Sequence, residues 1–373
     1  MLEMLFWFLL ILIFYVYFGY PFFLVIISFF FTSHVKKHNI TPFVSIIISV
    51  HNEENVVKRK IENCLDLDYP KEEMEIIIGS DNSMDKTDDI INEYTKSGVL
   101  FYKFGEQRGK VSVLNELVPK AKGEIIIFSD ARQVLDKNAL KELVKNFADE
   151  NVGAVSGELF ISGNKESAVS DGVGLYWDYE KFLRKLESQI GSTVGVTGAI
   201  YAIRKKLYVP PRTDTLLDDV FIPMKAVEKG YRVIFEPLAK AYDTFSKTPK
   251  EEAARKVRTL AGNWQIFFRM KNMFNPLKSK VALQLFSHKL LRVLIPYFLI
   301  ILLLTNYFLL GERIYNIFFI LQLGFYLSAL AGYFLISCRI KLFNISYTFC
   351  MLNYMAIKGL FVFLTDKQKV VWK

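Results

Sequence analysis

The longest hydrophobic segments lie at the two ends of the chain. The N-terminal segment, Met4–Ser33, contains no formal charge, and a helix of this length at about 1.5 Å per residue exceeds the roughly 30 Å hydrocarbon core of a bilayer. Near the C-terminus, residues 293–311 and 314–338 also lack formal charge and are separated only by Glu312 and Arg313. We therefore expect an N-terminal membrane anchor and a C-terminal helical hairpin.

A further apolar segment, about residues 342–364, is more polar than the others. Its polar residues include Asn344, Ser346, Asn353 and Lys358. If it spanned the membrane, it would carry the basic tail with Lys367, Lys369 and Lys373 outside the cell, against the usual bias of lysine towards the cytoplasm. We therefore expect an interfacial or re-entrant helix, with Trp372 at the level of the lipid headgroups.

Between these segments, short β-branched apolar runs alternate with charged amphipathic stretches, which predicts an α/β domain. Strands are expected at Val44–Val50, Met74–Gly79, Val99–Phe104, within Gly123–Gln133, and at Val152–Phe160, Thr197–Arg204 and Tyr231–Phe235. Helices are expected up to about Asp66, from about Lys110, around Leu140–Phe147, over Asp171–Glu187, from Asp218, and over Glu251–Met270. Neither a repeat nor a low-complexity linker interrupts this region, so residues 41–271 are predicted to form one domain, between an anchor (1–34) and a C-terminal membrane region (272–373; membrane helices at about 290–311 and 314–338).

Composition and charge agree with a membrane protein. The hydrophobic fraction of 52% exceeds the usual 45 to 50%, and Glu3 is the only early charge, which argues against a cleaved signal peptide. The pair Lys36 and Lys37 and the pair Arg339 and Lys341 flank the apolar segments, which indicates a multi-pass protein of the cell membrane with an external N-terminus and a cytoplasmic domain.

The net charge of +9 is assigned to contact with anionic lipid rather than with nucleic acid, because no nucleic-acid-binding motif is present. The three cysteines, Cys64, Cys338 and Cys350, have no metal-ligand spacing and are expected to be free thiols.

Candidate chemistry begins with acidic residues that follow buried strands. Asp130 follows the apolar run 125–128, and Asp81 follows the predicted strand at 74–79. In open α/β sheets ligands bind beyond the carboxyl ends of the strands, so these carboxylates suggest a metal-bound or sugar-bearing anionic ligand. The alternative for Asp81 is a residue that stabilises a turn.

Other charged residues lie near predicted helix starts. Arg108 and Lys110 could bind an anion at the start of their helix, or form a solvated cluster. Asp218 and Asp219 could be catalytic, or could simply interact with the helix dipole. Arg258 lies three residues after Arg255, so the two share one helix face and could meet an anion together.

Two nucleotide-binding classes lack their motifs. No glycine-rich turn follows the strand at 44–50, which argues against a nicotinamide-dependent oxidoreductase with a dinucleotide fold. No GxxxxGK[ST] motif is present, which excludes a P-loop enzyme.

The order of these features resembles the membrane-bound family 2 glycosyltransferases, whose members include bacterial cellulose, hyaluronan and poly-N-acetylglucosamine synthases. The shared order is an acid after the first strand, Asp after the second, a basic RGK, Asp130, a glycine-led strand, an acid pair and an arginine-bearing helix. The resemblance covers nearly the whole chain from Thr41. It implies a GT-A fold, a Rossmann-like mixed sheet.

The resemblance implies roles for the residues of the donor side. Glu53, in VHNEE, matches the nucleotide-binding acid, and Asp81 matches the aspartate that contacts uracil. Lys110, which follows Arg108, matches the lysine near the diphosphate. Asp130 matches the first aspartate of the DxD motif, which binds Mg²⁺ or Mn²⁺ on the nucleotide diphosphate.

It also implies roles on the acceptor side. Gly198 lies in the family's acceptor-side GA motif, and Arg258 matches the arginine of its QxxRW motif. Asp218 and Asp219 match the Glu-Asp pair, in which the aspartate, here Asp219, is the catalytic base.

The chain departs from the family pattern at two positions. Arg132 replaces the second DxD carboxylate, so a metal would lose one protein ligand and depend on Asp130, the diphosphate and water. Thr259 replaces the tryptophan that packs on a growing polymer, and Trp264, further along, is the candidate acceptor-side aromatic residue. With about three membrane segments, these differences favour transfer of a single sugar.

The expected function is inverting transfer from a nucleotide-diphosphate sugar, a UDP-sugar in the first instance, to a lipid-linked or glycan acceptor in cell-envelope or exopolysaccharide synthesis. A processive polysaccharide synthase is the alternative within the same fold, and product length would distinguish the two. A non-catalytic scaffold subunit is the alternative from another class, and turnover or hydrolysis of a nucleotide sugar would exclude it.

Overall fold

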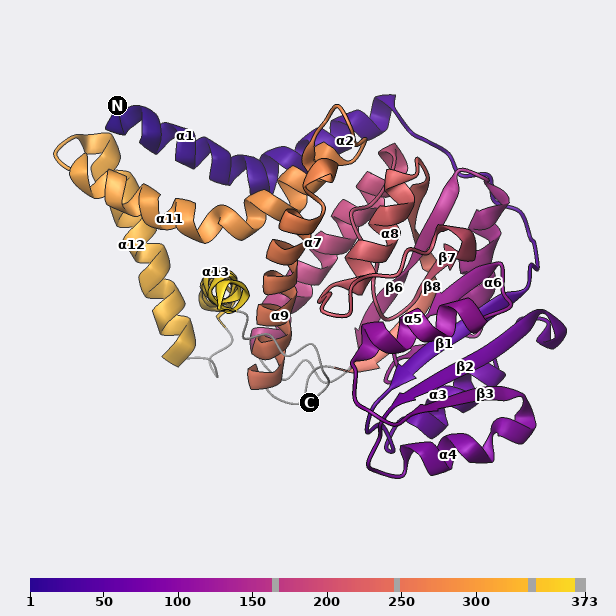
Figure 1. Cartoon of the computed structure of the whole chain (residues 1–373). Helices are drawn as coiled ribbons and strands as arrows, with labels where there is room; N and C mark the ends of the chain where they lie inside the picture. The colour runs from indigo at the N-terminus through magenta and orange to yellow at the C-terminus, as the bar shows by residue number, and fades with distance from the viewer. Residues whose placement is uncertain (163–167, 245–248, 335–339, 366–373) are drawn as a thin grey trace.

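The computed structural model describes residues 1–162, 168–244, 249–334 and 340–365. Its centre is a mixed sheet flanked by helices, and the apolar helices of both chain ends extend away from this domain on one side (Figure 1). Three sequence predictions lie outside the described residues: those for Cys338, for Trp372 and for the basic tail with Lys367, Lys369 and Lys373.

The sheet has eight strands within the described part of the chain, in the order β3-β2-β1-β4-β7-β6-β8-β5. The first four strands in sequence are parallel, β7 is antiparallel to both of its neighbours, and β8 runs parallel to β6. The strands are β1 (Val44–Val50), β2 (Met74–Asp81), β3 (Val99–Phe104), β4 (Ile125–Phe128), β5 (Val134–Leu135), β6 (Val152–Ser162), β7 (Tyr201–Arg204) and β8 (Arg232–Thr244). This is the predicted α/β class, with the mixed sheet that the resemblance implied.

Both faces of the central strands are buried because successive side chains of a strand point to opposite faces. Ile46 and Ile48 of β1 pack in one core with α3 (Val57–Leu65), α4 (Thr87–Glu93) and α6 (Ala139–Val144). Ile47 packs in the other core, with α5 (Lys110–Lys120) and α8 (Asp218–Glu228). The β-branched runs of the sequence therefore form fully buried strands.

Strand register brings the carboxyl ends of three strands to one edge of the sheet. Val50 of β1 pairs with Ser80, and Ile47 pairs with Phe128, the last residue of β4. Asp81 is the last residue of β2, whereas Asp130 lies two residues beyond β4. Both aspartates therefore reach the edge at which a parallel sheet binds ligands.

Two strand boundaries differ from the prediction. The strand predicted at Thr197–Arg204 begins only at Tyr201, because Thr197–Ile200 form a turn in which Ile200 N donates to Thr197 O (3.2 Å). The strand predicted to end at Phe235 continues to Thr244. It passes Pro237 by a register shift opposite residues 156–158, since proline cannot donate to a strand partner.

The described part of the chain contains four helices that are long and apolar enough to cross a membrane. The first is the N-terminal rod Leu2–Phe30, made of α1 (Leu2–Phe14), a π-helical turn (Tyr15–Gly19) and α2 (Tyr20–Phe30). The others are Ala282–Phe308, which contains α11 (Leu291–Phe308), α12 (Arg313–Phe334) and α13 (Lys341–Leu364). The sequence prediction counted three.

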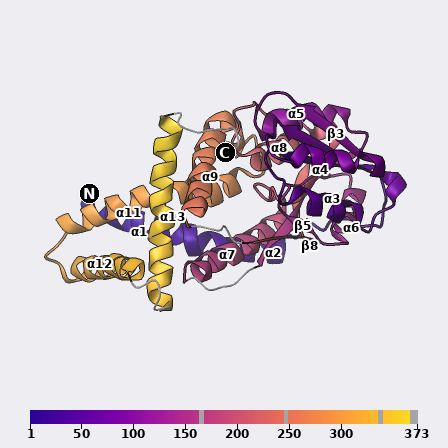
Figure 2. The ribbon, with the colours of Figure 1, turned by 90° about the horizontal axis from the view of Figure 1, so that it is seen from below.

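Figure 1 shows α11 beside α1 and joined to α12 by a short turn, as expected for the predicted helical hairpin. Helix α13 is one unbroken helix and runs across the direction of α1 and α11 (Figure 2). Its crossing direction is compatible with the interfacial orientation expected from the sequence, and this orientation stays a prediction.

Two long helices connect the membrane helices to the sheet domain. They are α7 (Ala168–Ile190) and α9 (Pro249–Arg269). Helix α13 crosses α9 at Gly359, where a Cβ atom would lie 2.8 Å from Leu260 Cβ, and α9 approaches the segment before α8 at Gly262, where a Cβ would lie 2.5 Å from Leu217 Cγ. Glycine is therefore required at both crossings.

Candidate active site

Three carboxylates and one lysine meet at the edge of the sheet. Lys110, the first residue of α5, donates a hydrogen bond to Asp130 Oδ1 (2.8 Å), and its Nζ lies 3.3 Å from Asp218 Oδ2. A Cβ placed on Gly198 would lie 3.6 Å from Asp219 Oδ2 and 3.8 Å from Asp130 Oδ2. The structure therefore brings together five of the predicted site residues around a small space next to Gly198.

Electrostatics explain why Lys110 is charged here. Burial alone would lower the pKa of its ammonium group, but the charges of Asp130 and Asp218 outweigh this and raise the pKa above its ordinary value. Lys110 is therefore charged at neutral pH and can donate charge-assisted hydrogen bonds to an anionic ligand.

Asp219 has the electrostatic environment of a base. Burial and the neighbouring Asp218 raise its pKa from 3.8 to about 6, against the lowering effect of Lys110, Lys289 and Arg184. Its main-chain oxygen accepts a hydrogen bond from Val196 N (3.0 Å), so the start of α8 is fixed beside the turn that contains Gly198. Its carboxylate is therefore mainly ionised at pH 7, and its pKa is close to neutral, as an efficient general base requires.

Asp81 is fully buried, and both of its carboxylate oxygens bind main chain. Oδ1 accepts from Arg108 N (2.8 Å) and Oδ2 accepts from Gly109 N (2.7 Å). Its carbonyl oxygen is bonded to His51 Nδ1 (2.7 Å). Asp81 thus fixes the loop that precedes α5, and its predicted contact with a nucleotide base stays a prediction.

Arg108 projects from this loop towards neighbouring side chains. Its Nη1 donates to Glu116 (2.6 Å), and its guanidinium lies 4.6 Å from the centre of the Phe104 ring. Its Nη2 is buried and has no hydrogen-bond partner among the described residues. An anion is one partner that would satisfy this donor.

Arg132 is held by an acid that the sequence analysis did not single out. Its Nε and Nη2 donate to the two carboxylate oxygens of Asp243, at 2.9 and 2.7 Å, a bidentate pair at the end of β8. Burial raises the pKa of Glu53. The charge of Arg132 opposes this rise and the charge of Asp130 adds to it, so both charges act on Glu53. Glu53, Asp130 and Arg132 therefore lie on one side of the site, where the DxD motif was expected.

A buried lysine supports the loop with Asp130. Lys60 of α3 is 1% exposed, and its Nζ donates to Ser129 Oγ (2.7 Å) and Gln133 O (2.9 Å). The sequence signal was a lysine on the apolar face of an amphipathic helix, which needs buried acceptors.

The remaining predicted residues lie outside this cluster. Arg258 is exposed on α9, and no hydrogen bond or ion pair joins it to a described residue. Trp264 lies further along α9 against Phe267, with ring centres 5.7 Å apart, and its buried Nε1 lacks a partner among the described residues.

No group of three or more His, Cys, Asp or Glu side chains in the described chain could hold a metal ion by itself. Asp130 is nevertheless suitable as a single ligand, because its side chain is 37% exposed and only Oδ1 is engaged, by Lys110. Mg²⁺ commonly binds through one or two carboxylates and completes its shell with phosphate and water. The residues present therefore fit a metal shared with a diphosphate.

Comparisons with known proteins bear on the family and on the fold. Residues 45–208 match the family model described as "Glycosyl transferase family 2". A protein named "Probable glycosyltransferase YdaM" from Bacillus subtilis is 27% identical over 253 residues, 64% of this chain and 59% of its own length. A "Poly-beta-1,6-N-acetyl-D-glucosamine synthase" from Staphylococcus aureus is 26% identical over 243 residues, 64% of this chain and 58% of its own. The chain thus spans about three fifths of the length of these curated relatives.

Among solved structures, a mannosyltransferase from Pyrobaculum calidifontis, described in complex with GDP-Man and Mn²⁺, superposes with a TM-score of 0.75. The match covers 99% of this chain and 100% of that one at 21% sequence identity. This likeness shows that the two chains share a fold over nearly their whole length.

Proposed function

Because residues 45–208 are a glycosyltransferase family 2 domain, we propose that this chain transfers a sugar from a nucleotide-diphosphate sugar to an acceptor hydroxyl at the membrane surface, with inversion. The observation that carries the proposal is the position of Asp219, whose pKa of about 6 suits a base, beside Asp130 and Lys110, which suit a diphosphate. A UDP-sugar is the first candidate donor.

The proposed step balances as a single displacement. The acceptor hydroxyl gives its proton to Asp219, its oxygen forms a bond to the anomeric carbon, and the bond from that carbon to the diphosphate breaks with its electron pair on the diphosphate. Inversion requires one base and no protein nucleophile. Asp219 supplies this base, and Asp218 keeps its pKa high enough to accept a proton near neutral pH.

Lys110 would stabilise the charge that gathers on the leaving diphosphate, since its ammonium already faces the carboxylates that line the site. Mg²⁺ or Mn²⁺, if bound at Asp130, would neutralise further charge on the diphosphate. Glu53 and the loop fixed by Asp81 would hold the nucleoside.

Apolar helices at both ends of the chain support an acceptor that is itself membrane-bound. The basic residues at the boundaries of these apolar segments support a catalytic domain on the cytoplasmic side of the cell membrane. Synthesis of a cell-envelope or secreted polysaccharide is the process that the named Staphylococcus aureus relative supports.

One observation favours a second candidate, a non-catalytic subunit. Arg132 occupies the position of a metal-binding carboxylate and is already paired with Asp243. Purified full-length protein distinguishes the two candidates. A thermal-shift screen of nucleotide sugars with and without Mn²⁺ would identify the donor, because a ligand that binds the folded state raises its apparent stability.

Hydrolysis or transfer of the identified donor is then measured for the wild type and for Asp219→Asn. The enzyme proposal expects turnover that Asp219→Asn abolishes. Donor binding without any turnover, in the presence of membrane lipids and acceptor fractions, would support the non-catalytic subunit.

A further inference from the structure

A large cavity lies among the apolar helices of the two chain ends and the helices α7 and α9. Its volume is about 900 Å³, within the range of about 300 to 1,000 Å³ typical of small-molecule sites. Phe6 of α1, Leu302 of α11, Leu321 and Phe325 of α12 and Phe349 of α13 contribute to its walls. Most of the lining is therefore hydrocarbon or aromatic, which suits an apolar chain.

One end of this cavity is cationic. This end is lined by Lys289 from the π-helical turn before α11 (Leu285–Leu290), by Arg292 of α11 and by Lys256 of α9. Glu180 of α7 is the acidic residue among the described lining. Three cations thus face one carboxylate in a mainly apolar cavity.

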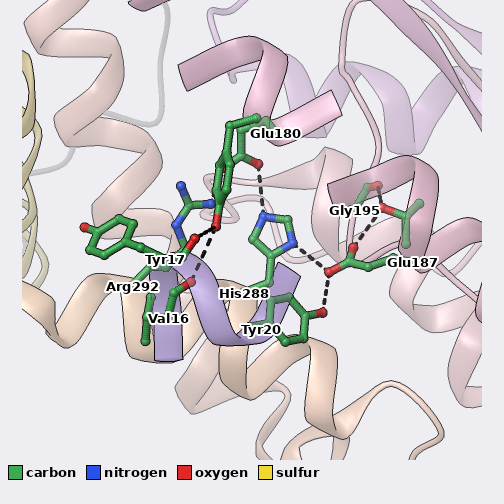
Figure 3. A network of polar contacts seen from close by, with 10 residues as sticks. Val16, Tyr17, Tyr20, Glu180, Glu187, Gly195, His288 and Arg292 are labelled. Carbon is green, nitrogen blue, oxygen red and sulfur yellow. Dashed lines mark hydrogen bonds and ion pairs between the residues drawn. The ribbon is translucent and has the colours of Figure 1, made fainter. Parts of the chain in front are cut away.

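In a buried network, that carboxylate is bonded to residues other than Lys289 (Figure 3). Glu180 is bonded to Arg292 and, through Oε2, to His288 Nε2 at 3.0 Å. The other ring nitrogen of His288 contacts Glu187 Oε1 at 2.8 Å, and the same oxygen accepts from Tyr20 of α2 at 2.7 Å. These contacts hold α2, α7 and α11 together, and both Glu180 and Glu187 are bonded within them.

Two cations beside the network have no such partner. Neither Lys289 nor Arg184 of α7 forms a hydrogen bond or ion pair with any residue that the structure describes. Both charges nevertheless act on Asp219 and oppose the rise in its pKa caused by burial and Asp218. A charged group in apolar surroundings is costly unless it is paired, so this position favours an anion.

The cationic end is also the end nearest to the candidate active site. Glu180 lines both the large cavity and a small one that Arg184 and Thr197 share. Thr197 precedes Gly198, which lies beside Asp219 and Asp130. The small cavity therefore links the cationic end of the large one to the turn that contains Gly198.

We propose that this cavity binds the acceptor, and that the acceptor is an anionic lipid. Its hydrocarbon chain lies between α1, α11, α12 and α13, its phosphate group contacts Lys289 and Arg292, and its hydroxyl-bearing headgroup extends towards Asp219. The identity of the bound molecule as the acceptor rests on the proposed function; the lipid site itself does not.

Binding is tested on delipidated full-length protein in detergent by native mass spectrometry, with three probes. Dioleoyl phosphatidic acid carries chain and anion, dioleoylglycerol carries the chain alone, and inorganic phosphate carries the anion alone. We expect retention of phosphatidic acid at a concentration at least tenfold lower than that needed for dioleoylglycerol, and no retention of phosphate. Equal binding of the two lipids would show that the phosphate group is not recognised and that the retained lipid is bound non-specifically, which would overturn the proposal.

Charge variants locate the phosphate. Lys289→Gln should weaken binding of phosphatidic acid at least tenfold, and Lys289→Arg should restore it, because either cation can pair with a phosphate. Lys280→Gln is the matched control, since it removes the same charge from an exposed position nine residues earlier. If Lys280→Gln weakens binding as much as Lys289→Gln, the effect is one of general surface charge and the site is wrong.

Steric variants locate the chain. Leu321 lines the cavity and is 62% exposed, whereas Leu327 lies six residues further along the same helix, is 64% exposed and does not line it. Leu321→Trp should therefore reduce lipid retention and Leu327→Trp should not. Equal retention by both variants would contradict the placement of the chain.

UDP binding, measured in parallel by calorimetry, separates this inference from the proposed function. If a variant loses lipid binding but still binds UDP, the substitution has damaged the lipid site and left the nucleotide site intact. Normal lipid binding by a wild-type protein that binds no nucleotide would overturn the proposed function and the acceptor assignment, while leaving the lipid site in place.

Discussion

Arg132 and Asp243 form a bidentate ion pair across the edge of the sheet, with N–O distances of 2.9 and 2.7 Å. Arg132 follows β4 by four residues, and Asp243 lies near the end of β8, 111 residues later. Arg132 therefore places a positive charge where the family pattern has a carboxylate, and this charge is paired with Asp243.

Arg132→Asp should create a metal site. The change removes the cation and adds a carboxylate near Asp130 and Glu53, and three carboxylates hold a hard cation better than one. We expect at least a tenfold gain in Mn²⁺ affinity in the presence of UDP, measured by calorimetry, with a lower apparent unfolding temperature without metal, since Asp243 then faces another negative charge.

Arg132→Gln is the control, since it loses the pair without adding a carboxylate. Its cost should be about 1 kcal/mol or less, because Arg132 is 44% exposed and Asp243 keeps its bond from Gln133. Equal Mn²⁺ affinity in the two variants would show that residue 132 lies away from the metal.

Asp81 and Asp130 should differ in their dependence on metal. Asp81→Ala frees the amides of Arg108 and Gly109 and so loosens the loop before α5. We expect at least tenfold weaker UDP binding whether or not Mn²⁺ is present. Asp130→Ala should weaken binding chiefly when Mn²⁺ is present, and calorimetric titrations of both variants under both conditions test the contrast. Normal UDP binding by both would mean that the nucleotide site is elsewhere.

Asp219→Asn tests the proposed base. Asparagine has nearly the same size and shape as aspartate but cannot accept the acceptor's proton, so fold and donor binding should be kept. We expect transfer to fall by roughly 10² to 10⁴-fold, the usual contribution of a general base, in an assay with radiolabelled donor. Asp218→Asn is the neighbouring control, and loss of transfer there with wild-type activity in Asp219→Asn would move the base by one residue.

The pH dependence of transfer should report the same group. Asp219 accepts a proton only when ionised, so kcat/KM should be level above about pH 6 and fall about tenfold per unit below it. Fluorescence-based unfolding gives an independent check. Because burial and Asp218 raise the folded-state pKa from 3.8 to about 6, ionisation of this carboxyl is less favourable in the folded protein than in the unfolded chain.

Stability should therefore decline as the pH rises from about 4 to about 6, and Asp219→Asn should remove this part of the decline. A variant that loses stability in parallel with the wild type over this range would exclude Asp219 as the group responsible.

Cysteine labelling tests the topology. Lys103 is an exposed residue on β3, so Lys103→Cys should be labelled by a membrane-impermeant maleimide in lysed but not in intact cells. Glu312→Cys, in the turn between α11 and α12, is the opposite control and should be labelled in intact cells. The native cysteines are first replaced by serine. Labelling of Lys103→Cys from outside would reverse the predicted orientation.

Local sequence patterns were sufficient for most elements because their signals do not depend on distant residues. The runs at Val44–Val50 and Val99–Phe104 became strands with these bounds, and the helix predicted from Asp218 begins there. Boundaries were less predictable where pairing extends an element. The strand β8 continues past Pro237 because β6 offers partners on the far side of a bulge, and nothing in the local sequence specifies that partner.

For the candidate site, too, local features were predictable and long-range relationships were not. The sequence by itself determined the residue types, their order and their closeness to strand or helix ends, and these were enough to indicate a glycosyltransferase before any geometry was known. It determined the long apolar helices for the same reason, since length and hydropathy are local properties of the sequence.

Only the tertiary structure decided which charges meet. It paired Lys110 with Asp130 and Arg132 with Asp243. It also placed Lys289 at the end of an apolar cavity, near Asp219, with no bonded acid among the residues that the structure describes. These relationships join residues 20 to more than 100 positions apart, and the energy of an ion pair depends on distance and burial rather than on sequence separation. A pattern read along the chain contains neither quantity, so it could name the charged residues but not their partners.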